Sequence, residues 1–201
     1  MLISKKMAAA ASGASMVRKM FEEGARLKAQ FGADKVFDFS IGNPDVPPPP
    51  QFKEAVIKIL TEDKPGIHGY MPNAGWPVVR EKVAAHLNQT QSQGLTNSFG
   101  PQHILMTVGA AGALNITFKA ILDPGDEVTT PRPYFMEYNS YVDNFGAKIV
   151  PAAPAEGFQP TSKSIAAKIT PATRAALINS PHNPTAAIYN VEDLADLGRT
   201  L

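Results

Sequence analysis

The chain has 201 residues, of which 44% are hydrophobic and 18% are charged, and its formal net charge is +1. A chain of this length and composition can bury a substantial core and is typical of a globular protein. The near-neutral charge and the lack of a basic stripe argue against nucleic acid as a partner. The sequence contains no cysteine, which excludes a disulfide framework and any cysteine-based metal site or nucleophile.

Residues 1–15, "MLISKKMAAAASGAS", raise the question of a targeting signal. They combine a lysine pair with an alanine-rich run, but this run is too short and too weakly apolar for the core of a signal peptide. We therefore expect a disordered leader and a cytoplasmic protein. No apolar run approaches the roughly 20 residues that span a bilayer, so we expect no membrane association.

Helices separated by stiff connectors are predicted in the N-terminal half. Apolar residues recur at helical spacing in three segments, at 15–31, 51–60 and 77–87. Ser15 is a candidate N-cap of the first. Between the first two, "VFDFSIG" (36–42) alternates like a short strand, and "NPDVPPPP" (43–50) must be extended because proline fixes φ and lacks a donor. We interpret the proline run as a connector; the alternative is a proline-rich ligand for a partner domain.

Strands alternate with helices from residue 103 onward. The expected strands are 103–108, 127–131, 147–151 and 174–180, and the expected helices are 110–122, 134–145, 161–169 and 190–201. This alternation predicts right-handed crossovers and an α/β fold, in which a mostly parallel sheet has helices on both faces. The last helix opens on an Asn190 cap with Asp193 three residues later and has no closing signal. We therefore expect the natural sequence to continue.

Ligands of such sheets bind at the carboxyl ends of the strands, and three motifs follow strands here. The small residues of "GAAGAL" (109–114) let backbone N–H groups close on an anion, although close helix–sheet packing would favour them equally. Tyr134 or Phe135 could stack on a flat ligand or fill the core. The Asn183 amide in "NSPHNPT" suits a phenolate-like oxygen, or serves only as a turn residue. Together the motifs indicate a planar cofactor that bears a phosphate.

With these motifs the chain resembles the N-terminal half of a class I/II aminotransferase, a pyridoxal-phosphate (PLP) enzyme of the aspartate aminotransferase fold. The segments that carry the resemblance, in order, are "SIGNPD" (40–45), "YMPNAGWPVVR" (70–80), "TVGAAGAL" (107–114), "LDPGDEVTTPRPYFMEY" (122–138) and "NSPHNPT" (179–185). The resemblance implies an N-terminal helical arm and small-domain segment at residues 1–47, and an incomplete PLP-binding large domain at residues 48–201.

The resemblance also implies which residues contact the cofactor. Backbone amides of Ala110 and Ala111 would bind the phosphate, and Phe135 would stack on the pyridine ring. Asn183 would hydrogen-bond the phenolic oxygen of the ring and stabilise its phenolate form. The Asn183–Pro184 peptide bond is expected to be cis. The family often has Ser or Thr in the phosphate loop, whereas the two alanines have no hydroxyl, so phosphate affinity would depend on amides and on groups outside this chain.

Two further roles involve the substrate and a second subunit. Tyr70 would reach the phosphate of the neighbouring subunit in a homodimer, and Gly42 would bring its backbone against the carboxylate of the amino-acid or 2-oxo-acid substrate. Ala186 stands where the family usually has a glycine, so the turn after Asn183 must tolerate a Cβ.

No catalytic residue and no metal ligand is assigned to this chain. The resemblance places the Schiff-base lysine, the acidic partner of the pyridine nitrogen and the arginine for the substrate carboxylate downstream. Lys163 precedes the Asn-Pro-Thr motif and is expected to be a solvated surface residue. The four histidines show no metal-ligand spacing and are expected on the surface or in turns: His68, His86, His103 and His182. The alternatives to an aminotransferase are a PLP lyase or decarboxylase, and a non-catalytic pseudo-enzyme or dimerisation module of the same fold.

Overall fold

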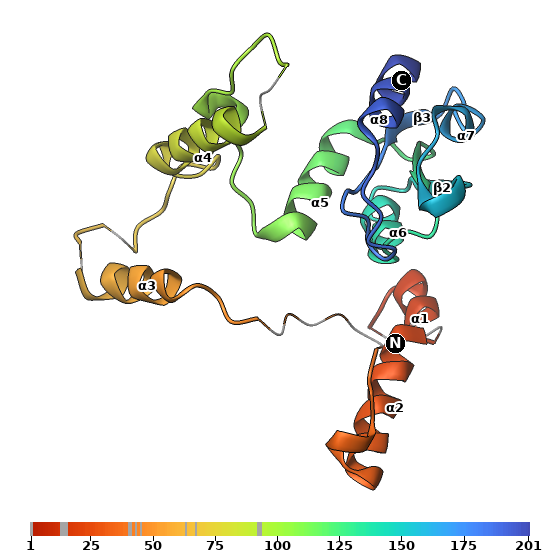
Figure 1. Ribbon diagram of the computed structural model, residues 1–201, viewed down its shortest axis with the longest axis horizontal. Helices are drawn as coiled ribbons and strands as arrows, with labels where there is room; N and C mark the ends of the chain where they lie inside the picture. Colours follow the sequence, from red (N-terminus) through yellow and green to blue (C-terminus); the bar gives the residue numbers. More distant parts are fainter. Residues whose placement is uncertain are drawn as a thin grey trace. The chain divides into compact units, whose positions relative to one another are not determined.

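The computed structural model describes residues 2–12, 16–39, 42, 44, 46–62, 64–66, 68–91 and 94–201. The contacts divide the chain into two compact units, Met1–Gly69 and Tyr70–Leu201, which are coloured from red to yellow and from yellow to blue in Figure 1. Within the described residues, no helix combines the length and the apolar character needed to cross a membrane.

The first unit consists of helices and extended connectors. Its elements are α1 (Lys5–Ser12), α2 (Met16–Phe31), the 3-10 helix η1 (Ala33–Lys35) and α3 (Pro50–Glu62). Helices α2 and α3 confirm the predictions for 15–31 and 51–60, while Ser15 lies outside the described residues. Helix α3 begins on a proline, whose fixed φ suits the first helical position.

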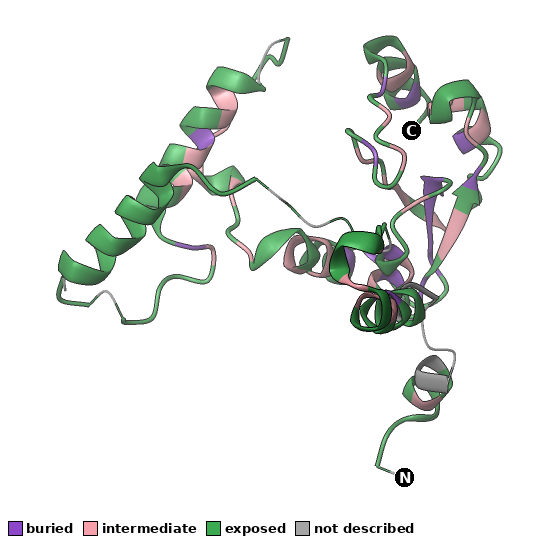
Figure 2. Ribbon diagram, turned by 60° about the horizontal axis from the view of Figure 1, so that its bottom comes forward, coloured by how far each residue is buried: buried purple, intermediate pink, exposed green. Residues whose placement is uncertain are grey.

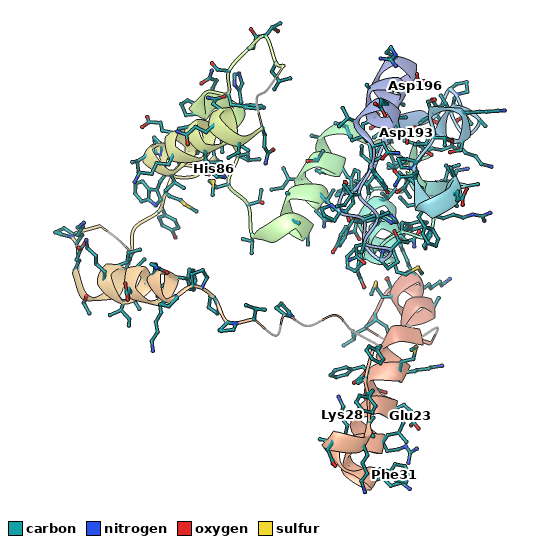
Figure 3. All side chains as sticks on the ribbon, in the orientation of Figure 1. Glu23, Lys28, Phe31, His86, Asp193 and Asp196 are labelled. Atoms are coloured by element: carbon teal, nitrogen blue, oxygen red, sulfur yellow. The ribbon has the colours of Figure 1, made fainter. Side chains whose placement is uncertain are left out.

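The prediction of a strand over residues 36–42 is wrong for those residues of the segment that the structure describes. Val36 has extended dihedrals, φ −121° and ψ 108°, but residues 36–39 and Gly42 are assigned to no strand. A strand needs a neighbour to hydrogen-bond, and the described residues of this unit contain no other strand. Segment 36–39 is instead attached to α2 by an ion pair of 3.0 Å between Lys28 Nζ and Asp38 Oδ2 (Lys28 is labelled in Figure 3).

The second unit contains the α/β part of the chain. Its elements are α4 (Pro77–Thr90), η2 (Pro101–His103), α5 (Gly109–Ile121), β1 (Glu127–Pro131), α6 (Glu137–Asp143), β2 (Lys148–Ala152), η3 (Glu156–Phe158), α7 (Ser162–Ala166), β3 (Thr173–Ala176) and α8 (Val191–Thr200). The three strands form one sheet in the order β2-β1-β3, and both pairings are parallel. The predicted parallel α/β sheet is therefore confirmed.

Helices cover both faces of this sheet. On one face Val128 of β1 packs with Phe118 of α5 and Val142 of α6. On the other, Ile165 of α7 and Leu197 of α8 pack with alanines of β2 and β3. The alternation of side chains along a strand requires this division, because successive residues point to opposite faces. Figure 2 shows buried residues on the sheet and on the helices that cover it.

One predicted strand is absent and another is short. Residues 104–108 follow η2 without forming a strand; Ile104 is extended (φ −111°, ψ 126°), and Met106 N–H donates to the Ala74 carbonyl at 3.1 Å. Within the described chain this segment has no strand beside it. The strand expected at 174–180 ends at Ala176. Only the Leu177 N–H extends its pairing with β1, donating to the Thr129 carbonyl at 2.8 Å.

The capping box expected at the start of α8 forms differently from the prediction. Asn190 is the N-cap, but its side chain makes no hydrogen bond to the helix backbone. Its Nδ2 instead donates to Asp193 Oδ2 at 3.1 Å. Helix α8 is held to α7 by a hydrogen bond of 2.5 Å from Ser162 Oγ to Asp196 Oδ2 (Figure 3 labels both aspartates).

Two adjacent threonines of β1 offer a matched test of the sheet's hydrogen bonding. Both are buried, and Thr130 Oγ1 donates to the Leu177 carbonyl at 2.8 Å, whereas Thr129 Oγ1 has no partner within the described residues. Because an unsatisfied buried hydroxyl costs about 1–3 kcal/mol, Thr129→Val should raise the free energy of unfolding by about 1 kcal/mol and Thr130→Val should lower it by about as much. Urea denaturation of the full-length protein measures both. A Thr129→Val variant that loses as much stability as Thr130→Val would contradict this description.

Candidate functional site

The chain topology brings three of the sequence motifs to one edge of the sheet. Helix α5 is joined to the start of β1 by the short connection at 122–126, so it runs back along the sheet and its amino end lies where β1 ends. Helix α6 begins shortly after β1, and the loop at 177–190 follows β3. Because β1 and β3 are parallel, these three starting points share the carboxyl edge of the sheet. Figure 1 shows α5 beside α6.

The amino end of α5 presents uncapped backbone amides. Gly109 has φ +68°, and no side chain caps the helix. The nearby Thr107 hydroxyl donates to the Gly109 carbonyl at 3.1 Å. Ala110 and Ala111 are exposed in the first turn. Free N–H groups and the positive end of the helix dipole make this turn suitable for an anion.

The two aromatic side chains before α6 differ: Tyr134 is held by a hydrogen bond, and Phe135 is partly exposed. The Tyr134 hydroxyl donates to Asn139 Oδ1 at 3.0 Å, and its ring stacks on Tyr138 with centroids 6.5 Å apart. Phe135 meets the same Tyr138 ring edge to face, with centroids 5.5 Å apart and planes at 84°. Because Phe135 remains 38% exposed, it is the ring of this pair with surface left for a flat ligand.

The loop after β3 is held by its own hydrogen bonds. The His182 N–H donates to the Ala187 carbonyl at 2.8 Å, and the His182 carbonyl accepts from the Ala186 N–H at 2.6 Å. The Asn183 N–H donates to Asn179 Oδ1 at 3.0 Å. Within the described residues, the exposed side-chain amide of Asn183 has no hydrogen-bond partner. The loop therefore fixes the backbone of this residue and leaves its amide available.

The Asn183–Pro184 bond is cis, as the resemblance implied; Arg132–Pro133 and Ser180–Pro181 are cis as well.

His182 lies in the turn-forming loop, one of the two settings expected for it, but it is buried and not on the surface. Only 5% of it is exposed, and its Nδ1 lies 2.7 Å from Thr185 Oγ1. Burial lowers the pKa of the His182 imidazole, since it disfavours the charged form. Tyr189, which the sequence did not single out, is equally buried, with its ring centroid 5.6 Å from that of His182. No periodicity marks buried residues inside a loop, so pattern reasoning had no means of finding this pair.

Two predicted site residues are not brought to this edge by any described contact. Tyr70 is fully exposed and begins the second unit. Gly42 belongs to the first unit, and a Cβ built on it would meet no atom within 4 Å, so packing does not require glycine there. Four residues of the "SIGNPD" segment (40, 41, 43 and 45) lie outside the described chain. The proposed roles of Tyr70 and Gly42 stay predictions. Lys163 is exposed on α7.

The "YMPNAGWPVVR" segment stabilises the loop that precedes α4. Gly75 has φ +96°, and a Cβ added there would lie 2.5 Å from Met106 Cγ, so this position requires glycine for its conformation and for its packing. Arg80 Nη1 donates to the Pro101 carbonyl at 3.0 Å. The glycine and the arginine of this motif thus join segments 70–80 and 101–106.

Ala186 is strained, and relieving the strain should stabilise the protein. It has φ +58°, in the left-handed region that costs a residue with a Cβ about 1–2 kcal/mol. After allowing for the greater freedom of glycine in the unfolded chain, Ala186→Gly is expected to raise the free energy of unfolding by about 0.5–1 kcal/mol. Thermal and urea denaturation measure the change. The matched control is Ala187→Gly, at a neighbour without positive φ, which should destabilise; stabilisation by both substitutions would refute the strain.

Comparison with known proteins agrees with this geometry. The model of the family "Aminotransferase class I and II" matches residues 34–201. The chain is 39% identical over 160 residues to the aspartate/prephenate aminotransferase of Thermus thermophilus, covering 79% of this chain and 40% of that protein. It is 38% identical over 161 residues to a probable aspartate/prephenate aminotransferase of Aquifex aeolicus, covering 79% and 39%.

Solved structures give the same result. A crystal structure of an aminotransferase from Eubacterium rectale superposes with a TM-score of 0.91 at 34% identity, covering 100% of this chain and 50% of that one. An aspartate aminotransferase of Thermus thermophilus superposes with a TM-score of 0.83 at 33% identity, covering 98% and 50%. The chain thus spans about half the length of these two structures and about two fifths of the length of the two curated relatives. It belongs to the class I and II aminotransferase family.

Proposed function

We propose that this chain supplies part of the active site of a PLP-dependent aminotransferase, which transfers an amino group between an amino acid and a 2-oxo acid. The observation that carries the proposal is the shared carboxyl edge of β1 and β3. Three features near this edge support the proposal: the uncapped amino end of α5, the exposed ring of Phe135, and the Asn183 side-chain amide, which has no partner among the described residues. Each of these groups corresponds to a different part of one planar, phosphate-bearing molecule.

The residues present fit pyridoxal phosphate. No side chain among the described residues caps the amides at the start of α5, where Ala110 and Ala111 lie, and uncapped amides suit a phosphate. Phe135 offers an aromatic face for the ring. Asn183 offers the N–H donors of a neutral amide, whereas a carboxylate at this position would repel a phenolate. Among the described residues, no group of three or more histidine, aspartate or glutamate side chains is placed to hold a metal ion.

Each of these residues would orient or stabilise the cofactor or the substrate, and none would form a covalent bond to them. When bound, pyridoxal phosphate supplies the electron sink of the reaction. The α5 amides would hold the phosphate at the helix terminus, and Phe135 would cover one face of the ring and exclude water from it. Asn183 would donate a hydrogen bond to the phenolic oxygen and favour its anionic form. Gly42 would admit the substrate carboxylate, and Tyr70 would contact the phosphate of a second subunit in a homodimer.

The rest of the proposed site is supplied from beyond this chain. We infer that the lysine that holds the cofactor, the acidic partner of its ring nitrogen and the arginine for the substrate carboxylate belong to the remainder of the protein. The division into an arm and small-domain segment at 1–47 and a large-domain part at 48–201 likewise stays a prediction about the complete protein. On its own, this chain is expected to be inactive.

The experiment uses the full-length protein with added pyridoxal phosphate. A visible absorption band should develop, and borohydride reduction should attach the cofactor covalently, as measured by protein mass. With an amino donor and a 2-oxo acid, a new amino acid should form in equal amount to the 2-oxo acid derived from the donor. Release of ammonia or carbon dioxide instead would identify a lyase or a decarboxylase. A protein that never binds the cofactor would be the non-catalytic module.

A further inference from the structure

The peptide unit that leads into Asn183 is hydrogen-bonded at both of its polar groups. Its carbonyl, which belongs to His182, accepts from the Ala186 N–H at 2.6 Å. Its N–H, which belongs to Asn183, donates to Asn179 Oδ1 at 3.0 Å. The His182 N–H is bonded as well, to the Ala187 carbonyl at 2.8 Å. The plane of this peptide is therefore fixed, and with it the direction in which the Asn183 side chain leaves the backbone.

The His182 side chain adds a buried anchor just before Asn183. It is 5% exposed, and its Nδ1 shares a hydrogen bond of 2.7 Å with Thr185 Oγ1. Its ring lies against Tyr189, with the ring centroids 5.6 Å apart and the planes tilted by 33°. Because protein interiors are close-packed, a buried ring that is also hydrogen-bonded has little freedom to turn. His182 is thus held by its side chain as well as by its backbone.

The Thr185 hydroxyl links the two sides of the turn. Besides its contact with His182, Thr185 Oγ1 accepts from the Ala187 N–H at 3.3 Å. Ala187 is also the residue whose carbonyl accepts from the His182 N–H. Asn183 and Pro184, which lie between these anchors in the sequence, are exposed. One hydroxyl therefore contacts the side chain before Asn183 and the backbone after it.

The side-chain amide of Asn183 depends on this framework for its direction. Within the described residues the amide has no hydrogen-bond partner of its own. A hydrogen bond weakens steeply when its donor angle departs from linear, so a donor must be aimed to be effective. A group that contacts a ligand is aimed by the residues that hold it. For Asn183 these residues are the ones that bond to its own peptide and to His182.

We propose that Asn179, His182 and Thr185 are positioning residues that aim the Asn183 amide at the phenolic oxygen of pyridoxal phosphate. The inference rests on the proposed function, in which Asn183 contacts this oxygen and the other three residues have no contact with the cofactor. They act on the cofactor only through Asn183. Removing their contacts should therefore alter the bound cofactor while the Asn183 amide is present, and have no effect on it once that amide is gone.

The test is a double-mutant cycle between Thr185→Val and Asn183→Ala in the full-length protein with saturating pyridoxal phosphate. Valine keeps the shape of threonine and lacks the hydroxyl. A misdirected amide stabilises the phenolate less, so Thr185→Val should raise the pH midpoint of the bound cofactor's visible absorption by about 0.5 unit. It should raise the Kd for the cofactor about threefold for the same reason. In the Asn183→Ala background, Thr185→Val should change neither value, because effects that pass through one side chain are not additive.

Further variants separate positioning from stability. Thr185→Ser keeps the hydroxyl and should match the wild type. Asn179→Ala removes the acceptor of the Asn183 N–H; it should act in the same direction as Thr185→Val, and it replaces that variant if valine prevents folding. The matched control is Thr173→Val at the amino end of β3, where Thr173 Oγ1 accepts from the Thr170 N–H at 2.9 Å. It should lower the melting temperature and leave the midpoint unchanged.

Three outcomes would overturn the inference. In the first, Thr185→Val and Asn179→Ala lower the melting temperature but leave the midpoint unchanged, which would make these contacts structural only. In the second, the midpoint moves equally with and without the Asn183 side chain, so the residues act by another route. In the third, the wild-type protein does not bind pyridoxal phosphate, which removes the proposed function as well. The third outcome is distinguishable because it appears before any variant is compared.

Discussion

Replacing Asn183 with alanine in the full-length protein is expected to weaken pyridoxal phosphate binding about 10- to 100-fold. This range corresponds to the 1.5–3 kcal/mol that a hydrogen bond to a charged group typically contributes. The amide is exposed at the carboxyl edge of the sheet, and its backbone N–H is held by Asn179 Oδ1 at 3.0 Å. Removing the side chain would therefore delete the proposed donor to the ligand while the loop keeps its internal hydrogen bonds.

A second measurement distinguishes the loss of this donor from general damage. If Asn183 stabilises the phenolate form of the cofactor, Asn183→Ala should raise the pH midpoint of the bound cofactor's visible absorption by about 1–2 units. The control is Asn97→Ala, which removes an exposed amide in the loop before η2 and should change neither value. An unchanged Kd and midpoint in Asn183→Ala would show that the amide does not face the ring.

Phe118→Ala is expected to lower the free energy of unfolding by about 3–5 kcal/mol, the usual cost of removing a buried phenylalanine. Phe118 is 3% exposed and packs between α5 and the sheet, against Val128 and Val142. The loss has two parts, because the ring no longer leaves water on folding and a cavity remains where it stood. Urea denaturation of the cofactor-free, full-length protein measures the change.

The matched control lies on the same helix. Ile116 is 48% exposed, so Ile116→Ala removes less buried surface and should cost less than about 1.5 kcal/mol. Phe118→Leu keeps most of the volume and should also cost less than about 1.5 kcal/mol. Equal losses in Phe118→Ala and Ile116→Ala would mean that Phe118 is not part of the core. Because α5 carries the turn that we propose binds the phosphate, Phe118→Ala should also weaken cofactor binding at temperatures where the variant is partly unfolded.

The sequence predicted most of the elements because their patterns are local. Helices α2 to α5 lie close to the predicted ranges, since an apolar stripe at helical spacing reports a buried face without knowledge of the partner. The strands β1 and β2 were found by their short apolar or alternating runs between turn residues. The segments 36–42 and 103–108 have the same local pattern, yet no strand forms in their described residues. Pairing depends on a neighbouring strand, which no local pattern contains.

The candidate site was likewise predictable from the sequence only in part. From the sequence alone we recognised three motifs that resemble one family, namely the small residues at 109–114, an aromatic pair and an Asn-Pro turn. We predicted from them a site at the carboxyl edge of a parallel sheet. Only the tertiary structure decided that Phe135 is more exposed than Tyr134, that Ala186 is in the left-handed region, and that His182 and Tyr189 are buried within the loop. These properties depend on the ring contacts of Tyr138 and on the contacts within the loop after β3. Such contacts are set by packing in three dimensions, whereas periodicity and motif spacing describe the chain one segment at a time.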